Sequence, residues 1–219
     1  MTEEQTEIIN KTANYVKEAL EGAEGGHDWW HILRVWNNAK HIGEKEDVDM
    51  YIVELGALLH DIADSKFHNG DEEIGPATAK KFLESINVDE GVVDHVENIV
   101  KHVSYKNRFE ENKWSSPELK VVQDADKLDA LGAIGIGRTF VFGGHKNRPM
   151  WNPEKPPINI TNKEEYKNND AATINHFYEK LLLLKDLMNT KAGKEIAEGR
   201  HKYMEDFLDQ FYAEWDGKK

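Results

Sequence analysis

The dipeptide His60-Asp61 ends the run Glu54-Leu55-Gly56-Ala57-Leu58-Leu59, which is apolar after its first residue, and places an imidazole and a carboxylate where a core helix normally carries hydrocarbon. Burying either group is costly unless a cation or a strong hydrogen-bond network compensates. His31 upstream and Asp126 downstream are further side chains of metal-ligand type. Two imidazoles and two carboxylates suit a borderline-hard divalent ion. The sequence therefore indicates a divalent metal site built from these residues.

Helical geometry limits how His60 and Asp61 can share an ion. Adjacent helical residues diverge by about 100° around the axis, so both reach one ion only from a helix end or with favourable rotamers. Taken alone, the dipeptide also fits a helix-end histidine beside a solvated aspartate. His31 and Asp126 favour the metal interpretation, because each lies on its own predicted helix at a polar break in an apolar pattern.

Helical periodicity dominates the rest of the chain, and no clear strand is evident. We expect an all-α bundle with helices over residues 8–20, 28–44, 49–63, 75–85, 90–102, 117–126, 130–138, 171–188 and 191–215. The third helix is apolar on most sides and should be central, with His60 and Asp61 in its last turn. Residues 115–118 resemble a capping box, or an N-cap with proline at the first helical position. The glycines of residues 130–138 predict close helix packing or backbone that approaches a phosphate.

Length and composition indicate one domain. At 219 residues two full domains would be cramped. We expect a metal-binding core over about 22–142, a loop over about 143–165 and C-terminal helices over about 166–216. The 39% hydrophobic and 32% charged residues describe a globular protein with a solvated exterior. No stretch is apolar enough to span a membrane, and the acidic start lacks secretory-signal character, so we expect a cytoplasmic protein.

Charge and cysteine content exclude several function classes. The absence of cysteine excludes disulfides and thiolate-bound zinc or iron-sulfur centres. A net charge of −13 argues against a large nucleic-acid footprint, because phosphate backbones are held mainly by accumulated Lys and Arg. A small phosphorylated metabolite remains compatible, held by one metal ion and local cations such as Lys106, Lys127 and Arg138.

The order His31, His60-Asp61, Asp126 resembles the signature of the HD-domain superfamily of metal-dependent phosphohydrolases. The surrounding motifs also resemble that family: His27-Asp28-x-x-His31-x-x-Arg34-Val35, Leu58-Leu59-His60-Asp61-Ile62-Ala63-Asp64, and residues 123–132, Gln-Asp-Ala-Asp-Lys-Leu-Asp-Ala-Leu-Gly. Residues 174–181 and 200–215 are similar to the small bacterial YpgQ/YedJ-like subgroup. The resemblance therefore covers most of the chain.

The resemblance implies an all-helical enzyme whose four ligands come from several helices and hold a divalent ion, with which the enzyme hydrolyses a small phosphorylated molecule. Pyrophosphohydrolysis of nucleoside or deoxynucleoside triphosphates is the most concrete candidate. Manganese or magnesium is expected first, with iron, cobalt, nickel or zinc as alternatives. Asp64 would act in proton transfer, although a solvated helix end is the alternative. Lys127 would bind phosphate, or serve as a surface lysine that offsets nearby carboxylates.

Five further residues are predicted to contact substrate: His27, Arg34, His102, Lys106 and Arg138. His27 would contact substrate or cap its helix. His102, with His68 and His95, could instead supply additional ligands of a two-metal site. Arg138 would neutralise phosphate or form a packing salt bridge.

Departures from the family pattern narrow the activity. Alarmone hydrolases of the superfamily carry Glu-Asp where this chain reads Asp64-Ser65, and the Gly-Tyr-Pro signature of cyclic dinucleotide phosphodiesterases does not occur. Two alternatives stay open: a dinuclear iron oxygenase, which would need His102 and His68 as ligands, and a non-catalytic nucleotide sensor. Apolar and aromatic helices beyond the core are compatible with a homodimer.

Overall fold

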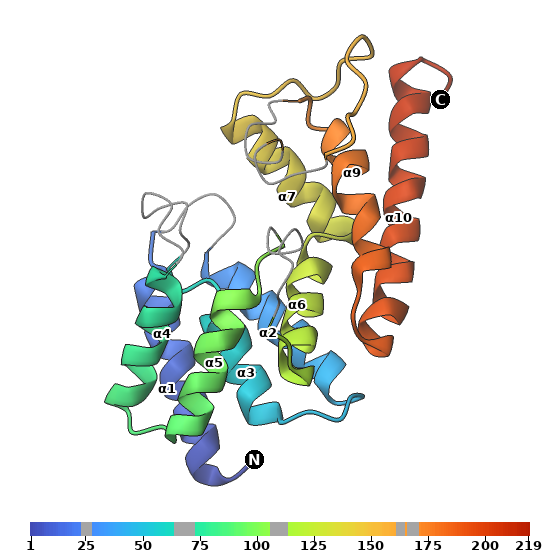
Figure 1. Cartoon of the computed structure of the whole chain (residues 1–219). Coiled ribbons are helices and arrows are strands. Elements are labelled where there is room, and N and C mark those ends of the chain that lie inside the picture. Colours follow the sequence, from blue (N-terminus) through green and yellow to red (C-terminus); the bar gives the residue numbers. More distant parts are fainter. Residues whose placement is uncertain (23–27, 64–72, 106–113, 161–164, 166–170) are drawn as a thin grey trace. The chain divides into compact units, whose positions relative to one another are not determined.

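The computed structural model describes residues 1–22, 28–63, 73–105, 114–160, 165 and 171–219 (Figure 1). Regular structure in these ranges is helical, with no strand, as the sequence predicts. The chain divides into two compact units, Met1–Asp126 and Lys127–Lys219. Within the described ranges, no helix combines the length and the apolar character that crossing a membrane requires.

The first unit contains a helical bundle around one buried helix. Its helices are α1 (Glu3–Ala19), α2 (Trp29–Gly43), α3 (Met50–Leu59), α4 (Ile74–Ser85), α5 (Glu90–His102) and most of α6 (Pro117–Asp129). Helix α3 packs against α1, α2 and α5, and each of its residues from Tyr51 to Leu59 is buried. The prediction that this helix is central is confirmed.

Helix α1 begins earlier than the apolar pattern suggested. The Thr2 hydroxyl accepts from the Gln5 amide at 3.2 Å, and the Gln5 side chain accepts from the Thr2 amide at 2.8 Å. This reciprocal capping box starts the helix at Glu3 rather than near residue 8. The Thr-x-x-Gln spacing was the sequence signal for it.

Helix α3 ends earlier than predicted, at Leu59 rather than near Ala63, with His60 as its C-cap. In a continuing helix the Asp61 amide would bond the carbonyl of Ala57. Here the His60 Nδ1 lies 2.8 Å from that carbonyl oxygen, and the Ile62 amide donates to the Leu59 carbonyl oxygen at 3.1 Å. His60 and Asp61 therefore lie at and beyond the helix end, where adjacent side chains are freer to converge.

Helix α6 starts as an N-cap followed by proline. The Ser116 hydroxyl accepts from the Leu119 amide at 3.0 Å, and Pro117 is the first helical residue. Of the two alternatives for residues 115–118, the structure therefore favours this one.

A glycine brings α5 and α6 close to α3. A Cβ at Gly56 would lie 3.0 Å from the Ile99 Cγ2 on α5 and 3.5 Å from the Val122 Cγ2 on α6. Gly56 precedes His60 by four residues, and Val122 precedes Asp126 by four, so each lies about one helical turn from a predicted ligand. The close approach therefore helps to set the spacing of α3 and α6 near those ligands.

The second unit contains α7 (Gly132–His145), α9 (Asn175–Glu179), the 3-10 helix η3 (Leu181–Leu187) and α10 (Lys191–Trp215). Helix α10 packs against α7 and η3. Helix α7 is longer than the predicted 130–138, and the predicted loop begins only after His145. A Cβ at Gly143 would overlap the Thr173 side chain, so this glycine serves close packing.

The prediction of one helix over 171–188 is wrong. Lys180 has φ −141° and ψ −59°, which ends α9, and the following turn is a 3-10 helix. Leu181 and Leu184 are both buried, and their i, i+3 spacing aligns them on one side of a 3-10 turn. The segment is thus divided at Lys180, and the 3-10 turn after it buries this leucine pair.

Aromatic packing holds part of the predicted loop against α10. The Trp151 ring centroid lies 4.9 Å from that of Tyr212, 5.0 Å from Trp215 and 6.3 Å from Phe211. Edge-to-face contacts of this kind add to the free energy of apolar burial. Residues 146–160 thus lack helix but pack through Trp151.

A half-buried histidine in this unit, His176, should make stability depend on pH. Burial, with Lys180 and Arg148 nearby, lowers the pKa of His176 from 6.5 to about 3. The unfolded chain therefore binds a proton that the folded chain does not between these values, so stability falls as pH drops below 6.5. At pH 5 the loss is about 2 kcal/mol. Denaturant unfolding at pH 7 and pH 5 should show a smaller difference for His176→Gln than for wild type.

The exposed His145 provides the matched control. His145→Gln should keep the wild-type difference between the two pH values. Equal pH dependence in wild type and His176→Gln would contradict the assignment.

Candidate metal centre

Two buried histidines meet between α2 and α3. The Asp28 carboxylate caps α2 by accepting from the His31 amide at 2.9 Å, which places His31 in the first turn. His31 is 1% exposed and His60 is 5% exposed. Their Nε2 atoms lie 3.2 Å apart. The structure thus brings together two side chains that are 29 residues apart in the chain.

The hydrogen bond of His60 orients its ring. Its Nδ1 lies 2.8 Å from the Ala57 carbonyl, which can only accept, so Nδ1 carries the proton. In the neutral imidazole the Nε2 lone pair then faces His31. A backbone carbonyl that fixes the tautomer and ring orientation is a common feature behind metal-binding histidines.

Two carboxylates join the histidines. The Asp126 Oδ1 lies 3.6 Å from the His31 Nε2 and 4.0 Å from the His60 Nε2, and the Asp61 Oδ2 lies 3.7 Å from the His31 Nε2. Two atoms that each bind one ion at about 2.1 Å are at most about 4.2 Å apart. All of these separations meet that limit. The donor set therefore fits a divalent ion.

The four predicted ligands do not form an equally tight set. Among the described residues, His31, His60 and Asp126 offer ligand atoms that all lie within 4.8 Å of one another. Asp61 approaches this group through His31. Its side chain is 19% exposed and that of Asp126 is 32% exposed, whereas both histidine side chains are only 2% exposed. The histidines thus form the buried side of the site, and the carboxylates form its solvent side.

Lys127 and Arg138 both have protein partners. The Lys127 Nζ donates to the Leu187 carbonyl at 2.8 Å. The Arg138 guanidinium donates to the carboxylate of Asp129, whose side chain is 2% exposed. Arg138 thus forms the packing salt bridge that the sequence left open. Substrate contact by either residue stays a prediction.

The other described candidates lie outside the tight cluster. Arg34 is half-buried, one turn after His31 on α2. His102 stacks on Trp114 with 6.0 Å between ring centroids, and the His95 Nε2 lies 2.9 Å from the Ser116 hydroxyl. The described part of the chain thus groups neither histidine with His31 and His60.

Four predicted residues, His27, Asp64, His68 and Lys106, lie outside the described ranges. Their roles stay predictions.

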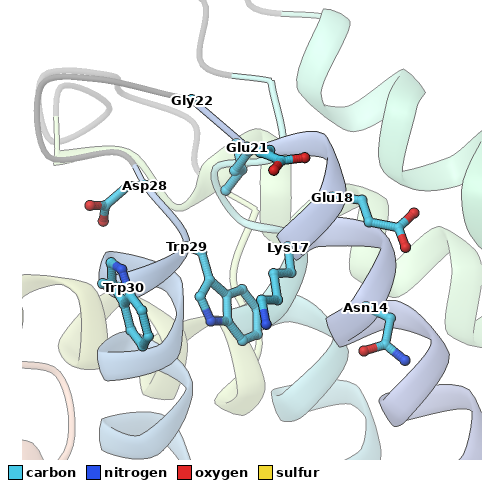
Figure 2. Close-up of a pocket in the computed structure, with 9 residues that line it drawn as sticks. Asn14, Lys17, Glu18, Glu21, Gly22, Asp28, Trp29 and Trp30 are labelled. Atoms are coloured by element: carbon cyan, nitrogen blue, oxygen red, sulfur yellow. The ribbon is translucent and has the colours of Figure 1, made fainter.

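A separate hollow of about 530 Å³ lies between the end of α1 and the start of α2. Figure 2 shows the Trp29 ring beside the Lys17 side chain on its wall. Glu18, Glu21 and Asp28 also line it, and none of the four predicted metal ligands does. Three carboxylates beside one ammonium repel phosphate. The hollow therefore does not suit the phosphate part of a substrate.

Comparison with known proteins identifies the family. The family model described as HD domain matches residues 29–131, which include the four predicted ligands. The uncharacterized protein YpgQ of Bacillus subtilis (strain 168) is 36% identical over 204 residues, covering 93% of this chain and 91% of YpgQ. The chain belongs to the HD domain family. Within it, this HD-domain protein is YpgQ-like, as the sequence motifs predicted.

Solved structures support the same assignment. A crystal structure of an HD-superfamily hydrolase from Bacillus thuringiensis is 45% identical, covers 97% of this chain and 98% of its own, and has a TM-score of 0.77. The crystal structure of Bacillus subtilis YpgQ in complex with ADP is 33% identical, covers 96% of both chains and also has a TM-score of 0.77. The likeness to these two structures thus covers nearly the whole chain, whereas the HD-domain model itself matches residues 29–131.

Sequence reasoning missed a partly buried polar pair that joins α2 to α3. The Trp36 Nε1 donates to the Glu54 carboxylate at 2.7 Å, and Glu54 is 4% exposed. The signal was available, since Glu54 is a charged residue within the most apolar helix of the chain.

Proposed function

We propose that this HD-domain protein is a metal-dependent phosphohydrolase that acts on a nucleotide or a related small phosphate. The observation that carries the proposal is the convergence of buried His31 and His60 nitrogens, 3.2 Å apart, with the carboxylate of Asp126. Asp61 is proposed as the fourth ligand from its 3.7 Å approach to His31. Manganese or magnesium is the proposed ion, since mixed nitrogen and oxygen ligands suit several divalent metals.

The histidines and the aspartates would have different roles in holding the ion. When bound, a divalent ion lowers the pKa of a coordinated water and polarises a phosphoryl oxygen. His31 and His60 would hold the ion from the buried side, with the Ala57 carbonyl orienting His60. Asp61 and Asp126, on the solvent side, would balance its charge and leave room for the substrate.

Proton transfer and phosphate binding are assigned to neighbours of the ligands. Asp64 is the proposed proton-transfer group, three residues beyond Asp61. Lys127 directly follows Asp126 and is the proposed phosphate cation. It would exchange its hydrogen bond to the Leu187 carbonyl for one to the substrate.

A nucleotide is the proposed substrate because a relative binds one. YpgQ has been crystallised with ADP, and that structure covers 96% of this chain. Together with the subgroup resemblance, this supports nucleoside or deoxynucleoside triphosphates, cleaved to a monophosphate and pyrophosphate. A protein with a net charge of −13 would depend on its metal ion to attract such a polyanion.

A substrate screen tests the function. Nucleotides and sugar phosphates would be incubated with the full chain and each divalent metal in turn, with phosphate and pyrophosphate quantified separately. We expect pyrophosphate from a nucleoside triphosphate with Mn²⁺ or Mg²⁺. Release of phosphate instead would mean that the enzyme cleaves a different phosphoanhydride or phosphoester bond from the one proposed. Ligand-induced thermal stabilisation without any product would favour the nucleotide sensor instead.

A further inference from the structure

A hydrogen bond links α2 and α3, the two helices that position the proposed metal-binding histidines. Trp36 lies on α2 and Glu54 lies on α3, and the indole N–H donates to the carboxylate at 2.7 Å. A carboxylate that is 4% exposed loses most of its hydration, which is costly unless its partners compensate. The location of this costly group on α3 suggests a role beyond core packing.

The bond lies about one and a half turns from the histidines on both helices. Trp36 follows His31 by five residues, and Glu54 precedes His60 by six. At 1.5 Å per residue these offsets are about 7.5 Å and about 9 Å along the helix axes. The two helices therefore run antiparallel here, with the histidine contact and the Trp36–Glu54 bond joining them at two separate levels.

Directional bonds define helix register better than apolar contacts do. Between the two levels, buried residues such as Ile32, Val35 and Leu58 supply attraction that is non-directional. A hydrogen bond weakens steeply when its distance or angle changes. A 2.7 Å indole-carboxylate bond therefore resists sliding of α2 along α3.

The third helix of the site has its own links. The Asn38 Nδ2 on α2 lies 3.4 Å from the carbonyl of Ala125, the residue before Asp126. The close approach at Gly56 brings α3 near Val122 on α6. Each pair of ligand-bearing helices thus has a specific contact of its own.

We infer that Trp36 and Glu54 are positioning residues for the metal centre, whose hydrogen bond sets the register of α2 on α3 and so the spacing of His31 and His60. The inference rests on the proposed metal site. Metal ligands must lie within a few tenths of an ångström of their ideal distances, so a small slide of α2 would weaken binding.

Two substitutions of Glu54 separate positioning from stability. Glu54→Gln and Glu54→Leu both remove the charge, but only glutamine keeps an oxygen that can accept from Trp36. In titration calorimetry of the full chain with Mn²⁺, we expect Glu54→Leu to raise Kd about tenfold and Glu54→Gln to stay within about threefold of wild type. Thermal unfolding without metal should leave Glu54→Leu no less stable than Glu54→Gln, because leucine suits this apolar site.

A double-mutant cycle tests the donor side. Trp36→Phe removes the N–H, and it should raise Kd in the wild-type background but have little further effect in Glu54→Leu. Should Glu54→Leu fail to fold, Trp36→Phe alone tests the inference, since Trp36 is only half-buried. Leu83→Ala, in the core of α4, is the control for destabilisation and should retain the wild-type Kd.

The outcomes separate this inference from the proposed function. Equal Kd values for Glu54→Gln and Glu54→Leu, or additive effects of Trp36→Phe and Glu54→Leu, would overturn the positioning role while leaving the metal site intact. A wild-type chain that binds no divalent ion would reject the metal site itself and the positioning role with it.

Discussion

The double replacement His60→Ala/Asp61→Ala is expected to abolish Mn²⁺ binding and to lower hydrolysis by at least about 10³-fold. The ion supplies several kcal/mol of transition-state stabilisation, and about 1.4 kcal/mol corresponds to a factor of ten in rate. The change removes a buried nitrogen 3.2 Å from the His31 Nε2 and a carboxylate 3.7 Å from it. Calorimetry with Mn²⁺ and product assays on the substrate found in the screen provide the measurements.

The helical fold should survive this replacement. Both residues lie at or beyond the end of α3, and the buried segment Tyr51–Leu59 is unchanged. Far-UV circular dichroism should therefore match wild type. His41→Ala/Asp47→Ala, which alters an exposed histidine and an exposed aspartate in the same unit, should retain binding and activity. Full hydrolysis by His60→Ala/Asp61→Ala would reject the proposed mechanism.

The second large effect is thermal stabilisation by the ion. A ligand that binds only the native state at 100 times its Kd adds about 2.7 kcal/mol to stability. For a chain of this length that corresponds to about 5–10 °C in Tm. Saturating Mn²⁺ should therefore raise the Tm of the metal-free protein by this amount, and EDTA should reverse it. Differential scanning calorimetry provides the measurement.

The ligand variants provide the controls for that shift. His31→Leu places an apolar side chain in a position that is 1% exposed and removes one proposed ligand. The Tm of this variant should therefore not respond to Mn²⁺. His41→Ala/Asp47→Ala should respond like wild type. An equal Tm shift in His31→Leu would place the stabilising ion elsewhere in the protein.

Local patterns predicted much of the fold. Apolar residues at helical spacing predicted the bounds of α2, α5 and α10 to within one residue. Burial of one face of a helix requires apolar residues at a regular spacing, which is visible in the sequence. The same reasoning predicted that α3 is central, since it is apolar on most sides. It failed over residues 171–188, where the backbone of Lys180 ends α9 and the chain continues as a 3-10 helix.

Residue types alone indicated the chemistry of the candidate site. His31, His60, Asp61 and Asp126 stood out as polar groups in apolar surroundings, and their order along the chain resembled the HD-domain signature. Burying such groups requires compensation wherever they lie in the fold. The sequence therefore predicted a candidate divalent site before any distance was known.

Distances and partners depended on tertiary packing. Only the folded chain places the His31 and His60 nitrogens 3.2 Å apart, gives Asp61 a looser place than Asp126, and pairs Arg138 with Asp129. The bond between Trp36 and Glu54 likewise joins residues 18 positions apart on two helices. Periodicity reports which face of a helix is buried, but not which helix covers it or at what register, because those depend on contacts between segments distant in sequence.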